Sequence, residues 1–284
     1  MAAKKTAWPP FPHDQAAFDY AGDKLRKAWG KLHAGDREPY PDLARAEELL
    51  DAVTKPPKGL DAKALAARLQ EAWRAYHRGD FQAAFEAGEA LGPLGASVAC
   101  KAIGIHAIYL VDDEAERLKR FEKAAELAEA AMLALPDEPN SHYRRAFALG
   151  RYSQGISIAK ALKLGLAGKV RESLDTTLAL APDHAEAHTA LGLYHAEIIA
   201  KVGSMIGGLT YGAKASEAEK HLKTALRLTP DSPIAHIEYG NMLLLLHGDK
   251  GEDAAAAAYE KASSLKPKDA MEKLDVEFAK SQLE

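Results

Sequence analysis

A repeated pattern phased on proline limits the possible folds of this chain more than any other feature of its 284 residues. Three segments, residues 135–150, 181–195 and 229–243, align on a Pro-Asp pair, and a histidine stands six positions after each proline. Small residues stand five positions before and ten positions after each proline. The aligned residues are His142, His188 and His236, then Ala131, Thr177 and Ala225, then Ala146, Gly192 and Gly240. Such self-similarity is typical of proteins built from stacked repeats.

Each repeat unit has the features of a pair of helices joined by a turn. Proline ends one helix and the aspartate after it can cap the next, as Asp183 does if it forms a capping box with Glu186. The small residues let two helices approach closely, and leucines fill the space between them. A single pair cannot bury its own apolar face, so successive pairs must stack. The pattern therefore predicts an all-α chain.

The residues inside the units resemble the tetratricopeptide repeat (TPR), a helix pair with large, Leu, Gly and Tyr positions in its first helix and Ala, apolar, Ala and Pro positions in its second. The matching residues are His188, Leu191, Gly192 and His195, then Ala218, Leu222, Ala225 and Pro230. An earlier unit, residues 72–91, has the Gly-Asp-aromatic turn of the family at Gly79, Asp80 and Phe81. The resemblance implies a right-handed α-solenoid of about five divergent TPR-like helix pairs with helical caps.

The predicted organisation has three parts. Residues 1–58 contain an N-terminal extended segment and capping helices, residues 59–267 contain the repeats, and residues 268–284 form a C-terminal capping helix. The repeats divide near 61–94, 95–136, 137–182, 183–230 and 231–267. The prolines at 136, 182, 230 and 267 are 46, 48 and 37 residues apart, so the units are longer than the usual repeat of about 34 residues and carry insertions.

The distribution of these insertions resembles that of the regulator of microtubule dynamics family, a divergent TPR group with bacterial relatives. The segments that carry this resemblance are HTALGLYHAE (188–197), the glycine-rich insertion after it, and HLKTALRLTPDS (221–232), within residues 135–284. The resemblance implies a helical interaction role and carries over no catalytic residue.

The N-terminal part offers two further expectations. Phe18, Leu25, Trp29 and Leu32 share one helical face, which either caps the open end of the solenoid or binds a partner. The preceding AWPPFP segment must be extended because its prolines forbid a helix, and it could dock on this molecule or on another.

Composition excludes several classes of function. The net charge of −4 gives no reason to expect a surface for nucleic acid or for an anionic membrane, and the single cysteine, Cys100, excludes an intrachain disulfide. No apolar segment follows the N-terminal lysines, and His, Glu, Lys or Gly interrupts the apolar stretches near 188–213 and 234–246. We therefore expect a cytoplasmic protein with no membrane span.

The stretch GSMIGGLTYGA (203–213) is unusual in a helical chain, because glycine costs a helix about 1 kcal/mol per residue. Its Gly and Thr spacing resembles a nucleotide-binding loop, but Leu209 stands where that loop needs lysine and no strand precedes it. With a second apolar insertion near 153–170, it is expected to lengthen the first helix of its pair and to form a loop at one edge of the solenoid. These loops either add a layer of core or form a flap over the groove. The flap glycines are Gly203, Gly207, Gly208 and Gly212.

Neither metal binding nor catalysis is predicted. His184, His188 and His195 could face one another along a helix with Glu197 nearby, but a histidine that recurs at a packing position favours a hydrogen-bonded structural role. Cys100 lies in an apolar run and is expected to be a buried thiol. No nucleophile has an evident base, and no cofactor is implied.

The remaining candidate is the groove formed by the first helices of the pairs. The predicted groove residues are Tyr109, Lys101, Tyr143, Phe147, Arg151, Glu197 and Asn241. Tyrosine and arginine are enriched at binding hot spots. We expect a non-catalytic scaffold that binds a protein or peptide, although not the carboxylate of a chaperone tail, because the Lys-and-Asn clamp is not reproduced. The alternative is a receptor for a small molecule or lipid, with the apolar insertions closing a pocket.

Overall fold

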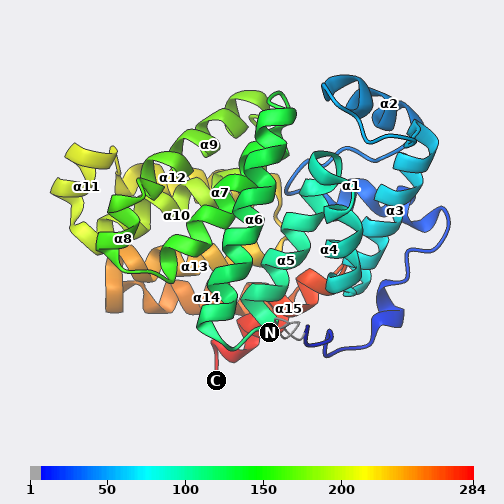
Figure 1. Ribbon diagram of the computed structural model, residues 1–284. Coiled ribbons are helices and arrows are strands. Elements are labelled where there is room, and N and C mark those ends of the chain that lie inside the picture. Colours follow the sequence, from blue (N-terminus) through cyan, green and yellow to red (C-terminus); the bar gives the residue numbers. More distant parts are fainter. Residues whose placement is uncertain (1–7) are drawn as a thin grey trace, which may run out of the picture.

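The computed structural model describes residues 8–284, and these form an all-helical stack without a strand (Figure 1). The expected all-α solenoid of TPR type is confirmed. Five pairs of adjacent helices follow one another along the chain. They are α3 (Ala62–Arg78) with α4 (Phe81–Glu89), α5 (Ala96–Leu110) with α6 (Glu114–Ala134), α7 (Pro139–Gln154) with α9 (Leu166–Leu180), α10 (Ala185–Val202) with α12 (Ala215–Leu228), and α13 (Pro233–His247) with α14 (Glu252–Ser264).

The insertions form short helices between the members of two pairs. Helix α8 (Ile158–Lys163) lies between α7 and α9, and α11 (Ser204–Tyr211) lies between α10 and α12. The glycine-rich stretch is thus helical rather than a loop. Gly203 and Gly212 flank α11 with positive φ angles of 82° and 64°, which only glycine adopts readily. Gly207 is buried inside the helix, where an added Cβ atom would lie 3.2 Å from a methyl carbon of Ile198.

The recurring histidines tie the start of each first helix to the turn before it. The Nε2 atoms of His142, His188 and His236 lie 2.7, 3.0 and 2.8 Å from the carbonyl oxygen of the proline six residues earlier. Each ring therefore donates Nε2–H to the carbonyl of the proline, which lies in the turn between two helices and has no helical N–H as its partner. The Pro–His spacing in the sequence is the signature of this link.

The cap of α10 differs from the expected capping box. His184, not Asp183, is the N-cap residue, and its Nδ1 atom accepts a hydrogen bond from the backbone N–H of Ala187 at 3.0 Å. Asp183 instead forms an ion pair with Arg37 at 3.0 Å. Since Nδ1 is the acceptor, the ring is neutral and its Nε2–H donates to Asn140 at 3.0 Å.

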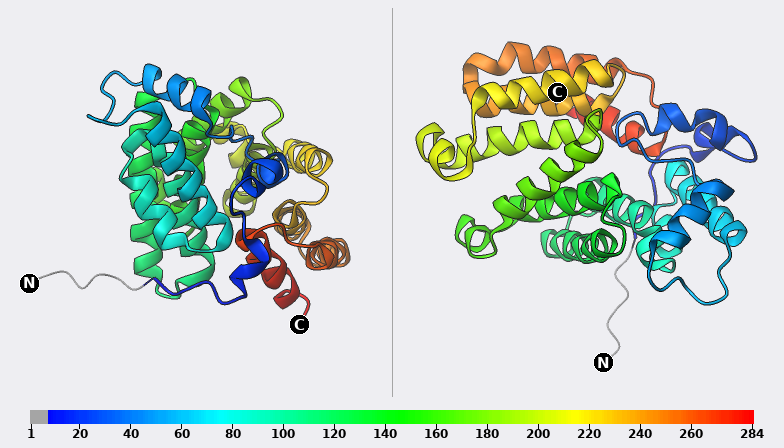
Figure 2. Two further views of the ribbon diagram at one scale, coloured as in Figure 1. Left: turned by 90° about the vertical axis from the view of Figure 1, so that its right-hand side faces the viewer. Right: turned by 90° about the horizontal axis from the view of Figure 1, so that it is seen from above.

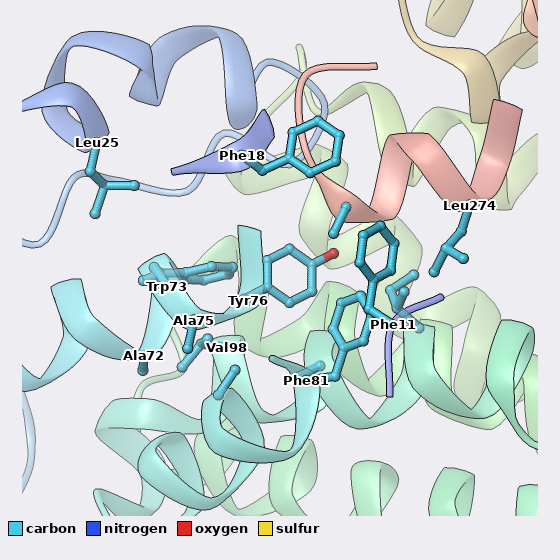
Figure 3. Close-up of a cluster of buried hydrophobic side chains, with 14 of the residues drawn as sticks. Phe11, Phe18, Leu25, Ala72, Trp73, Ala75, Tyr76, Phe81, Val98 and Leu274 are labelled. Carbon is cyan, nitrogen blue, oxygen red and sulfur yellow. The ribbon is translucent and has the colours of Figure 1, made fainter. Parts of the chain in front are cut away.

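The two ends of the chain meet. The N-terminal part contains a 3-10 helix (Gln15–Phe18), α1 (Lys24–Leu32) and α2 (Leu43–Ala52), and the chain ends with α15 (Ala270–Ser281). Helix α15 leaves the last pair and packs against α3 near the start of the stack, so the stack closes on itself (Figure 2). The core at this closure joins Phe11 and Phe18 to Trp73, Tyr76 and Leu274 (Figure 3).

The proline-rich N-terminal segment docks on this same molecule from Trp8 onward, the first described residue. Trp8 lies 5.4 Å from the ring of Phe85 and 4.5 Å from that of His106, and the guanidinium of Arg120 lies 4.2 Å from its ring centroid. The Nε2 atom of His106 also hydrogen-bonds to the carbonyl of Pro9 at 2.9 Å.

One stretch among the described residues, Gly92–Leu110, is long and apolar enough to cross a membrane by length and composition alone. It comprises a 3-10 helix and α5, and 72% of it is buried inside the fold. A central helix surrounded by α4, α6 and α7 must be apolar on most sides, which accounts for this composition.

Candidate functional site

The candidate site lies on the inner face, by which we mean the surface formed by α5, α7, α10 and α13, the first helices of four successive pairs. Residues 33–38 of the chain itself cover part of this face, with contacts to α5, α7 and α10. The backbone N–H of Glu186 donates to the carbonyl of Gly35 at 3.0 Å, and the Asn140 amide donates to the carbonyl of Asp36 at 3.0 Å. A Cβ atom on Gly35 would lie 3.1 Å from Glu186, so the contact is close. The segment occupies the groove as a bound peptide would.

The carboxylate of Asp36 anchors this segment. Lys101 and Arg144 donate to Oδ2 at 2.6 Å each, His33 donates to Oδ1 at 2.8 Å, and Asp36 has no exposed surface. Burial opposes ionisation, but the charge of Lys101 and the contact with His33 hold the pKa of Asp36 well below its usual value. Glu186 lies 3.1 Å from Lys101 and completes the balance of charge.

A buried chain of polar groups extends from Asp36 to the last helix. The Nε2 atoms of His33 and His77 are 3.2 Å apart, and Nδ1 of His77 lies 2.8 Å from the carboxylate of Asp269 at the start of α15. Burial lowers the pKa of His33 to about 4. These hydrogen-bonded polar groups link three segments that are distant in sequence, and they hold the closed form of the stack together.

Helix α15 covers another part of the inner face. The hydroxyl of Tyr76 lies 2.9 Å from the sulfur of Met271, and the hydroxyl of Tyr109 donates to Oδ1 of Asp275. Oδ2 of Asp275 is buried without a hydrogen-bond partner, and burial raises the pKa of this carboxyl well above its usual value. The carboxyl is thus held toward its protonated, uncharged form.

Residues 33–38 and α15, which we call the two covers, leave part of the inner face open as a cavity of about 280 Å³. Its walls are mostly apolar and come from α5, α7, α10, α13 and α15. Both insertions contribute to its lining, with Ile158 and Leu162 from α8 and Tyr211 from α11.

The polar groups of the cavity are paired with one another, mostly between different helices. Arg151 donates to Glu238 at 2.9 Å, which joins α7 to α13, and Gln154 donates to Glu197 at 2.5 Å, which joins α7 to α10. Lys201 lies 3.5 Å from Glu197 on the same helix. These pairs fix the spacing of the helices and leave polar atoms at the edge of an apolar space.

Six of the seven predicted groove residues line this cavity: Lys101, Tyr109, Tyr143, Phe147, Arg151 and Glu197. Two of them hydrogen-bond to the covers, because Lys101 donates to Asp36 and Tyr109 donates to Asp275. Asn241 lies outside the cavity lining and lies between Glu238, to which its amide donates at 2.7 Å, and Tyr259.

The sequence analysis did not find Asp36 or Asp275. Asp36 lies in residues 1–58, which are predicted to contain only an extended segment and capping helices, and Asp275 lies in the predicted C-terminal capping helix. One signal for Asp36 was available: Lys101 falls on an inner-face position and Arg144 follows one, and two cations on a buried face require an anion.

The other chemical candidates take structural positions. Nδ1 of His188 lies 2.8 Å from Nδ1 of His221 on α12, but among residues 8–284 no three His, Cys, Asp or Glu side chains converge as metal ligands would. The thiol of Cys100 is buried, donates to the carbonyl of Ala124 at 3.2 Å, and burial raises its pKa to about 12.

Comparison with known proteins supports the same class. Residues 97–205 match the family described as regulator of microtubule dynamics protein 1-3, which is less than half of the chain. Among solved structures, the fold is similar to TTC0263, a thermophilic TPR protein in Thermus thermophilus, with a TM-score of 0.54 and 19% identity over 77% of this chain and 100% of that chain. No curated protein matches the sequence significantly. The chain is a divergent TPR protein by fold, and part of it is similar to the microtubule-regulator family.

Proposed function

We propose that this chain is a non-catalytic, cytoplasmic TPR-type binding protein that holds a protein or peptide partner in the cavity of its inner face. The observation that carries the proposal is the position of the cavity, which is the part of the inner face that residues 33–38 and α15 leave open. Tyr143, Phe147 and Arg151 line it from the single helix α7. These residue types are well suited to anchor a partner, because large aromatic and guanidinium groups give much contact area.

The size of the cavity restricts the form of the partner. Its 280 Å³ lies near the lower end, about 300 Å³, of ordinary ligand pockets. A few apolar side chains fill such a space, whereas a long extended peptide needs the whole groove. We therefore infer a short segment anchored by apolar side chains, with Arg151 and Glu238 orienting its polar atoms at the edge.

A second candidate is a small apolar or lipid-like molecule bound in the same cavity. The contribution of both insertions to the lining favours it, since Ile158, Leu162 and Tyr211 add apolar surface to the cavity. Enclosure of this kind stabilises a bound apolar molecule by removing its surface from water.

We propose no catalytic role. The only serine that lines the cavity, within the described part of the chain, is Ser153, and its hydroxyl donates to the carbonyl of Gly150 at 2.7 Å, with no base beside it. Nucleophilic catalysis needs such a base within hydrogen-bond reach.

Affinity purification of the full chain followed by native mass spectrometry tests the proposal. The variants are Phe147→Ala, which removes a cavity wall, and Phe85→Ala, which removes a half-buried ring that lies outside the cavity against Trp8. We expect wild type and Phe85→Ala to recover the same protein partner and Phe147→Ala to lose it. A bound small molecule lost with Phe147→Ala would establish the second candidate. Equal recovery by all three proteins would refute a role for the cavity.

A further inference from the structure

The outer surfaces of the two insertions concentrate apolar side chains that the fold leaves in solvent. Helices α8 and α11 project at the same edge of the molecule, at the left in Figure 1 and in the right-hand view of Figure 2. We call α8, α11 and Leu164 the insert edge. Six of the thirteen exposed large apolar side chains among the described residues belong to it: Ile158, Leu162, Leu164, Met205, Ile206 and Leu209. Met205 is 75% exposed and Leu209 is 85% exposed, so neither contributes to the core.

The two insertions themselves carry charge of one sign, and the carboxylates near their lysines belong to other segments, Glu122 beside Lys160 and Glu197 beside Lys201. No aspartate or glutamate occurs between Glu138 and Glu172, or between Glu197 and Glu217. The same two stretches contain exposed lysines, which are Lys160, Lys163, Lys169, Lys201 and Lys214. Only Lys201 of these five has an ion pair within residues 8–284. A chain with a net charge of −4 thus keeps its apolar edge free of carboxylates.

The glycines of the stretch 203–213 explain how α11 is directed outward. A Cβ atom added to Gly203 or Gly212 would meet no other atom within 4 Å, so neither glycine is needed for packing. Both have positive φ, so they are needed for the backbone turns on either side of α11. These turns leave Met205, Ile206 and Leu209 on the solvent side of a helix only eight residues long.

We propose that the insert edge docks on an anionic lipid surface. Apolar side chains on a short helix enter the boundary between headgroups and acyl chains, and surrounding lysines are attracted to lipid phosphates. Carboxylates would oppose this contact, and the edge has none. The overall negative charge cannot produce such binding, so the attraction must be local to the insertions. Ile158 and Leu162 line the cavity as well as the edge, but Met205, Ile206 and Leu209 do not, so the inference does not depend on what occupies the cavity.

Co-sedimentation of the full chain with vesicles tests the proposal. The vesicles contain phosphatidylcholine alone, or phosphatidylcholine mixed equally with phosphatidylglycerol. Leu209→Glu places a charge on the edge, and Leu133→Glu makes the same change at a leucine of α6 that is 76% exposed. Lys160→Glu with Lys163→Glu reverses two charges of α8, and Lys27→Glu with Lys31→Glu changes the net charge equally on α1.

We expect the wild type to bind the mixed vesicles and not those of phosphatidylcholine alone, with binding that weakens as salt rises. Leu209→Glu and the double lysine reversal should each lower the partition coefficient about tenfold or more. The lysine reversal replaces two attractions to lipid phosphates by repulsions, and Leu209→Glu replaces an apolar contact by a repulsion. Both controls should bind as wild type does. Failure of the wild type to bind the mixed vesicles would overturn the proposal and leave a protein partner for this edge. Equal losses in the control variants would also overturn it.

Discussion

The replacement Asp36→Asn tests whether residues 33–38 hold the stack together through one buried charge. Lys101 and Arg144 each donate to this carboxylate at 2.6 Å, and their side chains are only 5% and 3% exposed. Removing one partner of a buried ion pair costs about 3–5 kcal/mol, because the remaining charge is left unpaired. Glu186 stays 3.1 Å from Lys101 and 3.6 Å from Arg144, so we expect a loss near the lower limit, about 3 kcal/mol.

Urea unfolding followed by circular dichroism measures this loss. The matched control is Arg37→Ala, which breaks the neighbouring ion pair with Asp183, whose side chains are 55% and 51% exposed. Exposed pairs contribute about 0–1 kcal/mol, so the control should remain close to wild type. Adding Lys101→Met to Asp36→Asn should recover part of the loss, because it removes one of the two stranded cations. Equal midpoints for Asp36→Asn and Arg37→Ala would refute the anchoring role.

Three other predictions concern packing, pH and thiol chemistry. A Cβ atom on Gly192 would lie 1.6 Å from Leu222, so Gly192→Ala should lower the midpoint of thermal unfolding markedly, whereas Gly168→Ala, which meets no atom within 4 Å, should not. Burial lowers the pKa of His184 from 6.5 to about 3. The neutral ring therefore stabilises the fold fully above pH 6.5, and this stabilisation is lost as the pH falls from 6.5 toward 3. His184→Asn keeps an N-cap acceptor but not this titration, and the stability of wild type relative to this variant should fall by a few kcal/mol between about pH 6.5 and pH 4. Cys100 should react with a thiol reagent only after unfolding, since it is buried and its pKa is about 12. Urea midpoints of wild type and His184→Asn, measured at a series of pH values, check the second prediction, and a stability difference that does not change with pH would contradict it. Rates of thiol labelling with and without urea check the third, and fast labelling of the native chain would contradict it.

Much of the fold could be predicted because its determinants are local. The small residue at Gly192 is required where α10 and α12 of the same pair touch, and the proline-histidine spacing reflects a hydrogen bond within six residues, as at His188. Such contacts recur in each unit, so the sequence repeats them. The same register placed Tyr143, Phe147 and Arg151 on the face that contains the cavity.

The closure of the stack could not be predicted, because its contacts are neither local nor periodic. The hydrogen bond from His77 to Asp269 joins residues 192 positions apart, and the bond from Lys101 to Asp36 joins residues 65 positions apart. Each occurs once, so no repeat marks it. Glycine also misled the local prediction for α11, because propensity disfavours a helix there. Gly207 is buried beside Ile198, with little space for a side chain, and such a tertiary contact is not visible in the local sequence.

The central claim is that the cavity of the inner face is the binding site, and filling the cavity tests it most directly. Gly150 lines the cavity, and a Cβ atom added there would meet no atom within 4 Å. Gly150→Trp should therefore occupy the space without disturbing the fold, while Gly150→Ala should leave it open and strengthen α7 by about 0.5–1 kcal/mol. Recovery of the bound partner or molecule is the measurement. The account predicts binding by wild type and Gly150→Ala and loss of binding by a folded Gly150→Trp, and full binding by Gly150→Trp would contradict it.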